Sequence, residues 1–320
     1  MSPRKAGAKA PERRSRRDVM LATPFTKQLV SKWSGEYCFA QPKLNGIRAV
    51  YRDGHLYSST GVELLSVPHV LKALEQMERA VGRLPSFDGE IYSHELSFQE
   101  LSGLARRTAD VDLAAASQLN FCVFDIAGTG MQYERFEQLG TTFGLAMDAG
   151  WKPEYVSLVP KRHLHLPLMQ EELHAYVREQ LAKGFEGAVL RHSLAEYSAK
   201  RSKDMLKIKP RRCDVYRVHA LLREYDKHGD PKNAVGAFLC IDDNSGETFA
   251  VGTGPFLTRA YREELWDNIL SLGEEMLFAV VAYPELTARS VPFNPSVIAV
   301  GNNPVSLREV YCAQDFLEEF

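Results

Sequence analysis

Apolar and polar positions alternate in short blocks from about Met20 onward, and this pattern predicts strands mixed with helices. Apolar β-rich runs predict strands at Tyr37–Ala40, Ile47–Arg52, His55–Ser58, Ser86–Tyr92, Phe121–Ile126, Tyr155–Val159 and Ala188–Arg191. Asp53-Gly54 is typical of a hairpin turn. Apolar residues at helical spacing predict helices near residues 67–77, 135–149 and 170–183. Because no Gly-rich loop follows the first strand, the pattern indicates an α+β fold rather than a dinucleotide-binding one.

Beyond Pro210 the pattern changes to strands of modest length with a single helix near residues 257–272. The strands are expected at Asp214–Leu222, Ala237–Ile241, Thr248–Val251, Leu277–Tyr283 and Val297–Val300. Such a set suits a small closed β-barrel of the OB type. We therefore expect a disordered basic tail at 1–19, an α+β domain at 20–211 and a barrel domain at 212–320.

Composition is that of an ordinary globular protein, with 45% hydrophobic and 25% charged residues. No apolar run approaches the roughly 18 residues that would span a membrane, and the first twenty residues lack a signal-peptide core. The five cysteines lie far apart in the sequence, so we expect no zinc site and no disulfide framework. A reducing, cytoplasmic location and a monomer without membrane contact are expected.

Positive charge is concentrated in two segments although the net charge is only −2. Residues 1–19 hold seven Lys or Arg against two acidic residues, and Lys200–Arg212 holds seven against one. The first segment suits a solvated tail or an arm that binds phosphate, and the sequence leaves both open. The second lies at the expected domain boundary and favours contact with a polyanion.

Polar side chains interrupt five of the apolar β-runs, where burial is costly unless the group has a partner or a function. The runs are Lys43–Arg48 (KLNGIR), Phe87–Ile91 (FDGEI), Val123–Ile126 (VFDI), Phe185–Arg191 (FEGAVLR) and Met205–Lys209 (MLKIK). Alternation places Lys207 and Lys209 on one strand face. One nucleophilic lysine, carboxylates for a divalent metal and further lysines are what nucleotidyl transfer requires.

In order and spacing, these five runs resemble the motifs of the covalent nucleotidyltransferases, which include ATP-dependent DNA ligases, RNA ligases and mRNA capping enzymes. The compact chain is most similar to small bacteriophage-type DNA ligases. The resemblance covers about Met20 to Asn303 and implies a nucleotidyltransferase (adenylation) domain of antiparallel sheets with helices, followed by a small OB-fold β-barrel. It also implies ATP, Mg²⁺ or Mn²⁺, and nicked double-stranded DNA as substrate.

The resemblance assigns each matching residue a role. Lys43 would carry AMP, Lys207 and Lys209 would hold the α-phosphate, and Glu186, with Glu90, would ligate the metal. Glu90 and Arg48 would address the ribose. Phe124 would stack on adenine, although a plain core aromatic is the alternative, and Gln41 could offer a donor and an acceptor to the adenine edge. Asp125 would support the site by hydrogen bonds, and Arg191 and Arg106 could be surface ion pairs.

Three positions depart from the family pattern. Asn45 stands where the family usually has Asp, and Ser59 stands where it usually has a basic residue. In the barrel, Val300 falls about where a cation is expected over the pyrophosphate, and Arg289 is the candidate substitute. These departures keep two alternatives open beside DNA ligase: an RNA ligase of the same superfamily, and a non-catalytic protein that binds nicks or ends. His163 and His165 lack metal-ligand spacing, so no zinc is expected.

Overall fold

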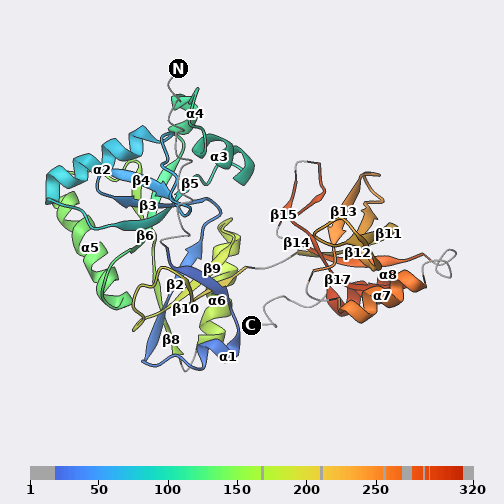
Figure 1. The fold of residues 1–320 in the computed structure, drawn as a ribbon. Coiled ribbons are helices and arrows are strands. Elements are labelled where there is room, and N and C mark those ends of the chain that lie inside the picture. The colour runs from blue at the N-terminus through green and yellow to red at the C-terminus, as the bar shows by residue number, and fades with distance from the viewer. Residues whose placement is uncertain are drawn as a thin grey trace, which may run out of the picture. The chain divides into compact units, whose positions relative to one another are not determined.

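The computed structural model describes residues 19–166, 169–209, 212–254, 257–268, 276–283, 285–287 and 289–312 (Figure 1). The predicted disordered tail lies almost wholly outside these residues. The chain forms two compact units, which meet in sequence between Ile208 and Lys209. Each unit is described below by itself.

The first unit contains ten strands and six helices among its described residues. The strands are β1 (Leu21–Pro24), β2 (Tyr37–Lys43), β3 (Ile47–Arg52), β4 (His55–Ser58), β5 (Phe87–Tyr92), β6 (Asn120–Ile126), β7 (Val156–Leu158), β8 (Arg162–His165), β9 (Gly187–His192) and β10 (Arg201–Ile208). The helices are α1 (Lys27–Val30), α2 (Pro68–Val81), α3 (Phe98–Ala105), α4 (Leu113–Ala116), α5 (Gln132–Asp148) and α6 (Met169–Ala182).

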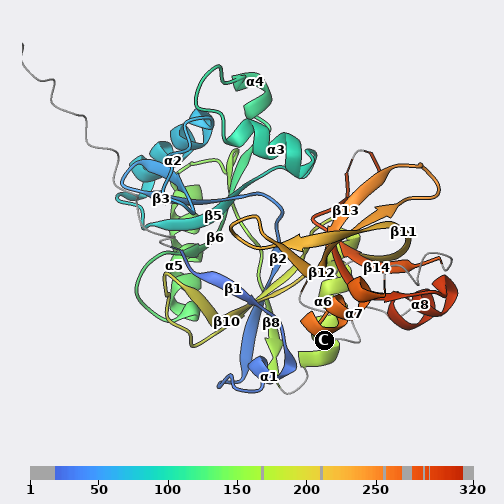
Figure 2. The same ribbon diagram turned by 45° about the vertical axis from the view of Figure 1, so that its right-hand side comes forward.

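The strands of this unit form two five-stranded sheets. One has the order β1-β10-β9-β2-β8 and the other β4-β3-β5-β6-β7. Most pairs are antiparallel, as predicted, but β1 runs parallel to β10 and β7 runs parallel to β6. Figure 2 shows β1 beside β10, at the edge of the first sheet. This N-terminal strand was not predicted, because its four residues carry no pattern that distinguishes a strand from a loop.

Strand alternation separates a helix-covered face of the second sheet from a polar face. Along β5, Phe87 and Ile91 are buried in the same core as α2 and α5, and Figure 1 shows both helices on one side of this sheet. Because successive side chains point to opposite faces, Asp88 and Glu90 lie on the other side. The buried apolar stripe of α2 follows the predicted helical spacing.

The second unit is a closed five-stranded barrel of order β11-β12-β13-β17-β14, with a separate two-stranded sheet, β15-β16. Its elements are β11 (Arg212–Tyr225), β12 (Pro231–Ile241), β13 (Thr248–Gly252), α7 (Arg259–Asp267), β14 (Phe278–Tyr283), β15 (Glu285–Leu286), β16 (Pro292–Phe293), β17 (Ser296–Gly301) and α8 (Pro304–Tyr311). Each predicted strand coincides with one barrel strand. The predicted helix corresponds to α7, which begins at Arg259 and ends at Asp267; the predicted end at residue 272 lies outside the described residues.

Cys213 and Cys312 form a disulfide that joins the start of β11 to the end of α8. The expectation that no cysteines pair is therefore wrong for these two. The other three cysteines, Cys38, Cys122 and Cys240, remain as thiols. Distance along the chain was misleading, because the two partners are 99 residues apart in sequence and come together only when the barrel closes. Within the described part of the chain, no helix is long and apolar enough to cross a membrane.

Candidate active site

A cavity of about 220 Å³ lies in the first unit, between the two sheets, and Lys43 is part of its wall. Residues from seven strands line it, and several are those that the sequence predicts: Leu21, Ala22, Gln41, Pro42, Lys43, Leu44, Arg48, Glu90, Phe124, Val189, Arg191, Arg201, Met205 and Lys207. The fold thus gathers side chains that are more than 160 residues apart in sequence.

Lys43 ends β2, and its ammonium group forms an ion pair with Glu186. The backbone supports this pair: the Glu186 N–H donates to the Lys43 carbonyl at 3.0 Å, immediately before Lys43 pairs with Gly187 across β2 and β9. The Lys43 side chain is 22% exposed and that of Glu186 is 12% exposed. A lysine that is partly open to solvent and faces a carboxylate is placed to react once it loses its proton.

Glu90 lies on the polar face of the second sheet and is held by the turn that follows Lys43. The Gly46 N–H donates to Glu90 Oε1 at 2.9 Å. Burial raises the pKa of Glu90, while the charges of Lys43 and Arg48 and the Gly46 N–H act in the opposite direction. Only glycine fits at position 46, because a Cβ there would lie 2.3 Å from the Ile91 carbonyl oxygen. The glycine of the first motif thus lets the turn approach β5 and bind Glu90.

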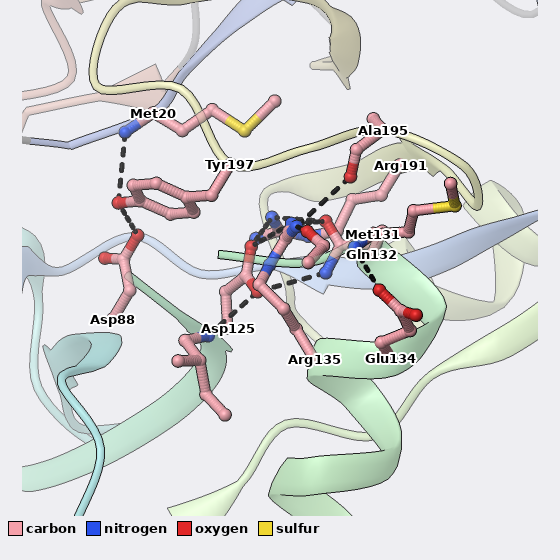
Figure 3. Close-up of polar contacts among 12 residues, drawn as sticks. Met20, Asp88, Asp125, Met131, Gln132, Glu134, Arg135, Arg191, Ala195 and Tyr197 are labelled. Atoms are coloured by element: carbon pink, nitrogen blue, oxygen red, sulfur yellow. Dashed lines mark hydrogen bonds and ion pairs between the residues drawn. The ribbon is translucent and has the colours of Figure 1, made fainter. Parts of the chain in front are cut away.

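Arg48 is held by a second carboxylate rather than pointing freely into the cavity. Its Nε and Nη2 atoms donate to the two Asp88 oxygens, each at 2.6 Å, in the bidentate geometry that guanidinium and carboxylate favour. Asp88 also accepts from the Tyr197 hydroxyl at 2.7 Å, and that hydroxyl accepts from the Met20 N–H at 3.2 Å (Figure 3). The residues just before β1 are thereby tied to the site.

Asp125 is the centre of a wholly buried polar network (Figure 3). It accepts from Arg135 Nε at 2.8 Å, from Arg191 Nη1 at 2.9 Å and from Gln132 Nε2 at 3.0 Å. The supporting role predicted for Asp125 agrees with these contacts. Arg191 is not the surface residue that its sequence allowed, since only 2% of it is exposed. Burial lowers its pKa, and repulsion from Arg48 and Arg135 adds to this effect against the attraction of Asp125.

This network reaches the cavity through Gln41 and Phe124. Arg191 Nε donates to Gln41 Oε1 at 2.8 Å, and Gln41 Nε2 donates to the Phe124 carbonyl at 3.4 Å. The Phe124 ring packs on Leu44 and is 7% exposed, with the guanidinium carbon of Arg48 4.4 Å from its centroid. The Gln41 oxygen therefore already accepts from an arginine and one amide N–H already donates to a carbonyl, which leaves the second amide N–H for a bound base.

The two lysines of the last motif are placed differently. Lys207 lies in β10 and lines the cavity, whereas β10 ends at Ile208 and Lys209 begins the second unit. Lys209 is not among the described residues that line the cavity. The predicted contact of both lysines with one phosphate therefore stays a prediction.

The positions that depart from the family pattern can also be located. Asn45 and Ser59 are partly buried and lie in turns, and Arg289 is exposed. Val300 packs against the core of the barrel, so its apolar side chain serves the fold. Within the described residues, no group of three or more His, Cys, Asp or Glu side chains could hold a metal by itself, and His163 and His165 lie in β8.

Sequence reasoning missed Arg135 and Tyr197. Arg135 is 1% exposed and makes hydrogen bonds to Asp125, Gln132 and the carbonyls of Gly130 and Ala195. Its position in an amphipathic helix, on the same face as Phe136 and Leu139, was the available signal. A charge on an apolar helix face indicates a buried partner, but nothing local names that partner.

Comparison with known proteins agrees with this geometry. The model of the ATP dependent DNA ligase domain matches residues 19–209. A DNA ligase of African swine fever virus (isolate Pig/Kenya/KEN-50/1950) is 25% identical over 288 residues, which are 84% of this chain but only 64% of the viral protein. The chain thus spans slightly less than two thirds of the viral relatives' length. A DNA ligase of Haemophilus influenzae is 27% identical over 74% of this chain and 78% of its own length.

Solved structures show the same fold. One from a structure–function analysis of Lig E DNA ligases matches with a TM-score of 0.67 and 19% identity, covering 88% of this chain and 98% of that one. The ATP-dependent DNA ligase of bacteriophage T7 matches with a TM-score of 0.51 and 16% identity over 88% and 97% of the two chains. The mixed α/β fold is therefore that of the nucleotidyltransferase-like ligase structures. Because the family model matches more than half of its residues, the chain belongs to the ATP-dependent DNA ligase domain family.

Proposed function

We propose that this chain is an ATP-dependent DNA ligase that seals nicks between a 5′-phosphate and a 3′-hydroxyl in duplex DNA. The observation that carries the proposal is the position of Lys43, which lies in the wall of the cavity between the two sheets and forms an ion pair with Glu186 beside Glu90. Family membership supports it, and so do the names of the viral and bacterial relatives.

In the first step, Lys43 Nζ would attack the α-phosphorus of ATP. The new N–P bond forms as the P–O bond to pyrophosphate breaks, and the lysine proton passes to solvent. The adenosine would occupy the cavity against Gln41 and Phe124, while Lys207 and the buried arginines offset the phosphate charge. The 5′-phosphate of the nick would then take AMP from Lys43, and the 3′-hydroxyl would displace AMP to complete the strand.

A divalent metal fits the donors around Lys43. Mg²⁺ commonly binds through one or two carboxylates together with substrate phosphates and water, so it does not need a preformed cluster of three protein ligands. Glu186 and Glu90 both interact electrostatically with Lys43 and could supply such oxygens. When bound, Mg²⁺ or Mn²⁺ would neutralise part of the phosphate charge.

The fold of the second unit also favours DNA as the substrate. We propose that its closed five-stranded barrel is an OB-fold, a fold that commonly binds oligonucleotides. The chain would act as a monomer on nicked duplex.

We also propose a cytoplasmic site of action. Because reducing surroundings keep cysteines as thiols, this location predicts that Cys213 and Cys312 are reduced in the source cell, which thiol trapping would test.

A joining assay tests the proposal. Purified chain would be mixed with ATP, Mg²⁺ and a duplex with one 5′-phosphorylated nick, beside Lys43→Ala and the matched surface variant Lys32→Ala. We expect the parent and Lys32→Ala to join the strand and Lys43→Ala to fail while remaining folded. Nicks with DNA or RNA on the 3′ side separate a DNA ligase from an RNA ligase, because the 2′-hydroxyl is what distinguishes them. Joining by Lys43→Ala, or no joining by folded parent protein, would contradict the proposal.

A further inference from the structure

Three aromatic rings form a group at the edge of the candidate active site that the steps above do not use. They are Tyr92 at the end of β5, His94 just after it, and Phe185 before β9. The ring centroids of His94 and Phe185 lie 5.4 Å apart, and that of Tyr92 is 6.4 Å from Phe185. A 2.8 Å hydrogen bond between the Tyr92 hydroxyl and His94 Nδ1 fixes the histidine ring. We call these three residues the aromatic ledge.

The aromatic ledge is continuous with the catalytic groups along two paths. Tyr92 lies two residues beyond Glu90 on the same face of β5, so it is about 7 Å farther along the strand. Phe185 directly precedes Glu186, the partner of Lys43. On their inner side, the Tyr92 and Phe185 rings pack against the small core of Leu44, Phe124 and Val159 that underlies the cavity.

On the outer side, the ledge is open. His94 is exposed, and Tyr92 and Phe185 are only partly buried. Partly exposed rings beside a reactive lysine are suited to stacking on a base or packing on a sugar, and such contacts tolerate any base sequence because every base has a π-face. A nick-sealing enzyme has this requirement, because it meets nicks in every sequence context.

The chemistry of the second step selects the occupant. Once AMP is bonded to Lys43, its adenosine fills the cavity, so the 5′-phosphate of the nick has to approach from outside the cavity. The nucleotides beside the nick then lie on the surface next to Lys43 and Glu186, where the ledge is. Resting on the proposed function, we propose that the aromatic ledge is a stacking platform for the nucleotide that borders the nick.

Nick binding without turnover tests this directly. Fluorescence anisotropy would compare the parent with His94→Ala and Phe185→Leu, on labelled nicked duplex without Mg²⁺. His165→Ala is the matched control, because His165 is an exposed histidine on a strand of the same unit. We expect each ledge variant to weaken binding by roughly tenfold, the low-to-middle range for losing one base stack, and the control to match the parent.

Two further measurements separate stacking from a structural role. First, the rate of self-adenylation with ATP, which involves no DNA, is expected to stay within about twofold of the parent for each ledge variant. Second, an abasic residue would be placed on one side of the nick or on the other, and at one of these two positions it should weaken binding by the parent. At that position it should cause little further loss of binding in the ledge variants. Parent-like binding by both variants, loss of adenylation in parallel, or an abasic effect that is the same in parent and variants would overturn the proposal. Because binding is measured without joining, failure of the ligase proposal would appear separately, as a parent that binds nicks but does not seal them.

Discussion

The buried pair of Arg135 and Asp125 offers the sharpest test of what holds the candidate site together. Neither side chain has any measurable exposure. Arg135 donates to both Asp125 oxygens, at 2.8 and 3.2 Å, and to the carbonyls of Gly130 and Ala195 at 2.7 and 3.1 Å. Replacing Arg135 with Met keeps much of the length and apolar stem but removes every donor.

Removing one partner leaves the other charged and buried. Breaking a buried ion pair in this way typically costs about 3–5 kcal/mol of folding free energy. Arg135→Met leaves two carbonyls without their donor, and Asp125→Asn leaves Arg135 and Arg191 without the carboxylate that pairs with both. We therefore expect each variant to lose about 3–5 kcal/mol and the double variant to lose about 1–3 kcal/mol less than the sum, since the two share one interaction.

Urea unfolding followed by tryptophan fluorescence would measure these losses. Trp33 and Trp151 lie in the first unit, so a Trp266→Phe background makes the signal specific for that unit. Arg79→Met, on the exposed face of α2, is the matched control and should change stability by less than about 0.5 kcal/mol. Single losses below about 1 kcal/mol, or losses that simply add, would refute the reasoning that the network is a coupled support of Gln41 and Arg191.

Three other predictions concern the turn, the barrel and the tail. Gly46→Ala should cost about 1–3 kcal/mol of folding free energy in the same unfolding assay, because its Cβ would meet the Ile91 carbonyl. Gly103→Ala is the control and should not destabilise the protein, because a Cβ there has open space. Equal effects of the two substitutions would contradict this. Cys213→Ser should lower the stability of the barrel by about 4–5 kcal/mol, because the disulfide closes a loop of about 100 residues. Thermal unfolding with and without reductant would test this, and the difference between parent and variant should vanish when the parent is reduced. Residues 2–18 hold seven Lys or Arg. Deleting them should reduce the slope of log binding constant against log salt concentration by about 0.9 for each DNA phosphate that the tail neutralises. An unchanged slope would mean that the tail does not contact the DNA.

Local patterns were sufficient to predict much of the fold. The strands at Ile47–Arg52 and His55–Ser58 coincide with β3 and β4, because the two-residue turn at Asp53-Gly54 marks where one strand ends and the next begins. The five polar interruptions indicated groups that the structure does bring to one place, with Lys43, Glu90 and Lys207 all in the cavity wall. A polar side chain in a buried strand needs a partner, and this requirement can be recognised from one sequence.

Partners that meet only through tertiary packing could not be named in this way. Arg135 meets Asp125 only when α5 packs on the second sheet, and Tyr197 reaches Asp88 from a segment 109 residues away. The Cys213–Cys312 pair has the same origin, since closure of the barrel and docking of α8 set its distance. The ends of the predicted strands were also uncertain, because they too depend on the tertiary fold. The alternation of Lys207 and Lys209 predicts one shared face, but β10 stops between them where the first unit ends.

The central claim is that Lys43 carries AMP, and peptide mapping by mass spectrometry tests it most directly. Folded chain freed of bound nucleotide would be incubated with ATP and Mg²⁺, digested and searched for adenylated peptides, before and after addition of nicked duplex. The account predicts AMP on Lys43 alone, removed when the nick is supplied and absent from Lys43→Ala. Adenylate on another residue, or none on folded protein, would contradict it.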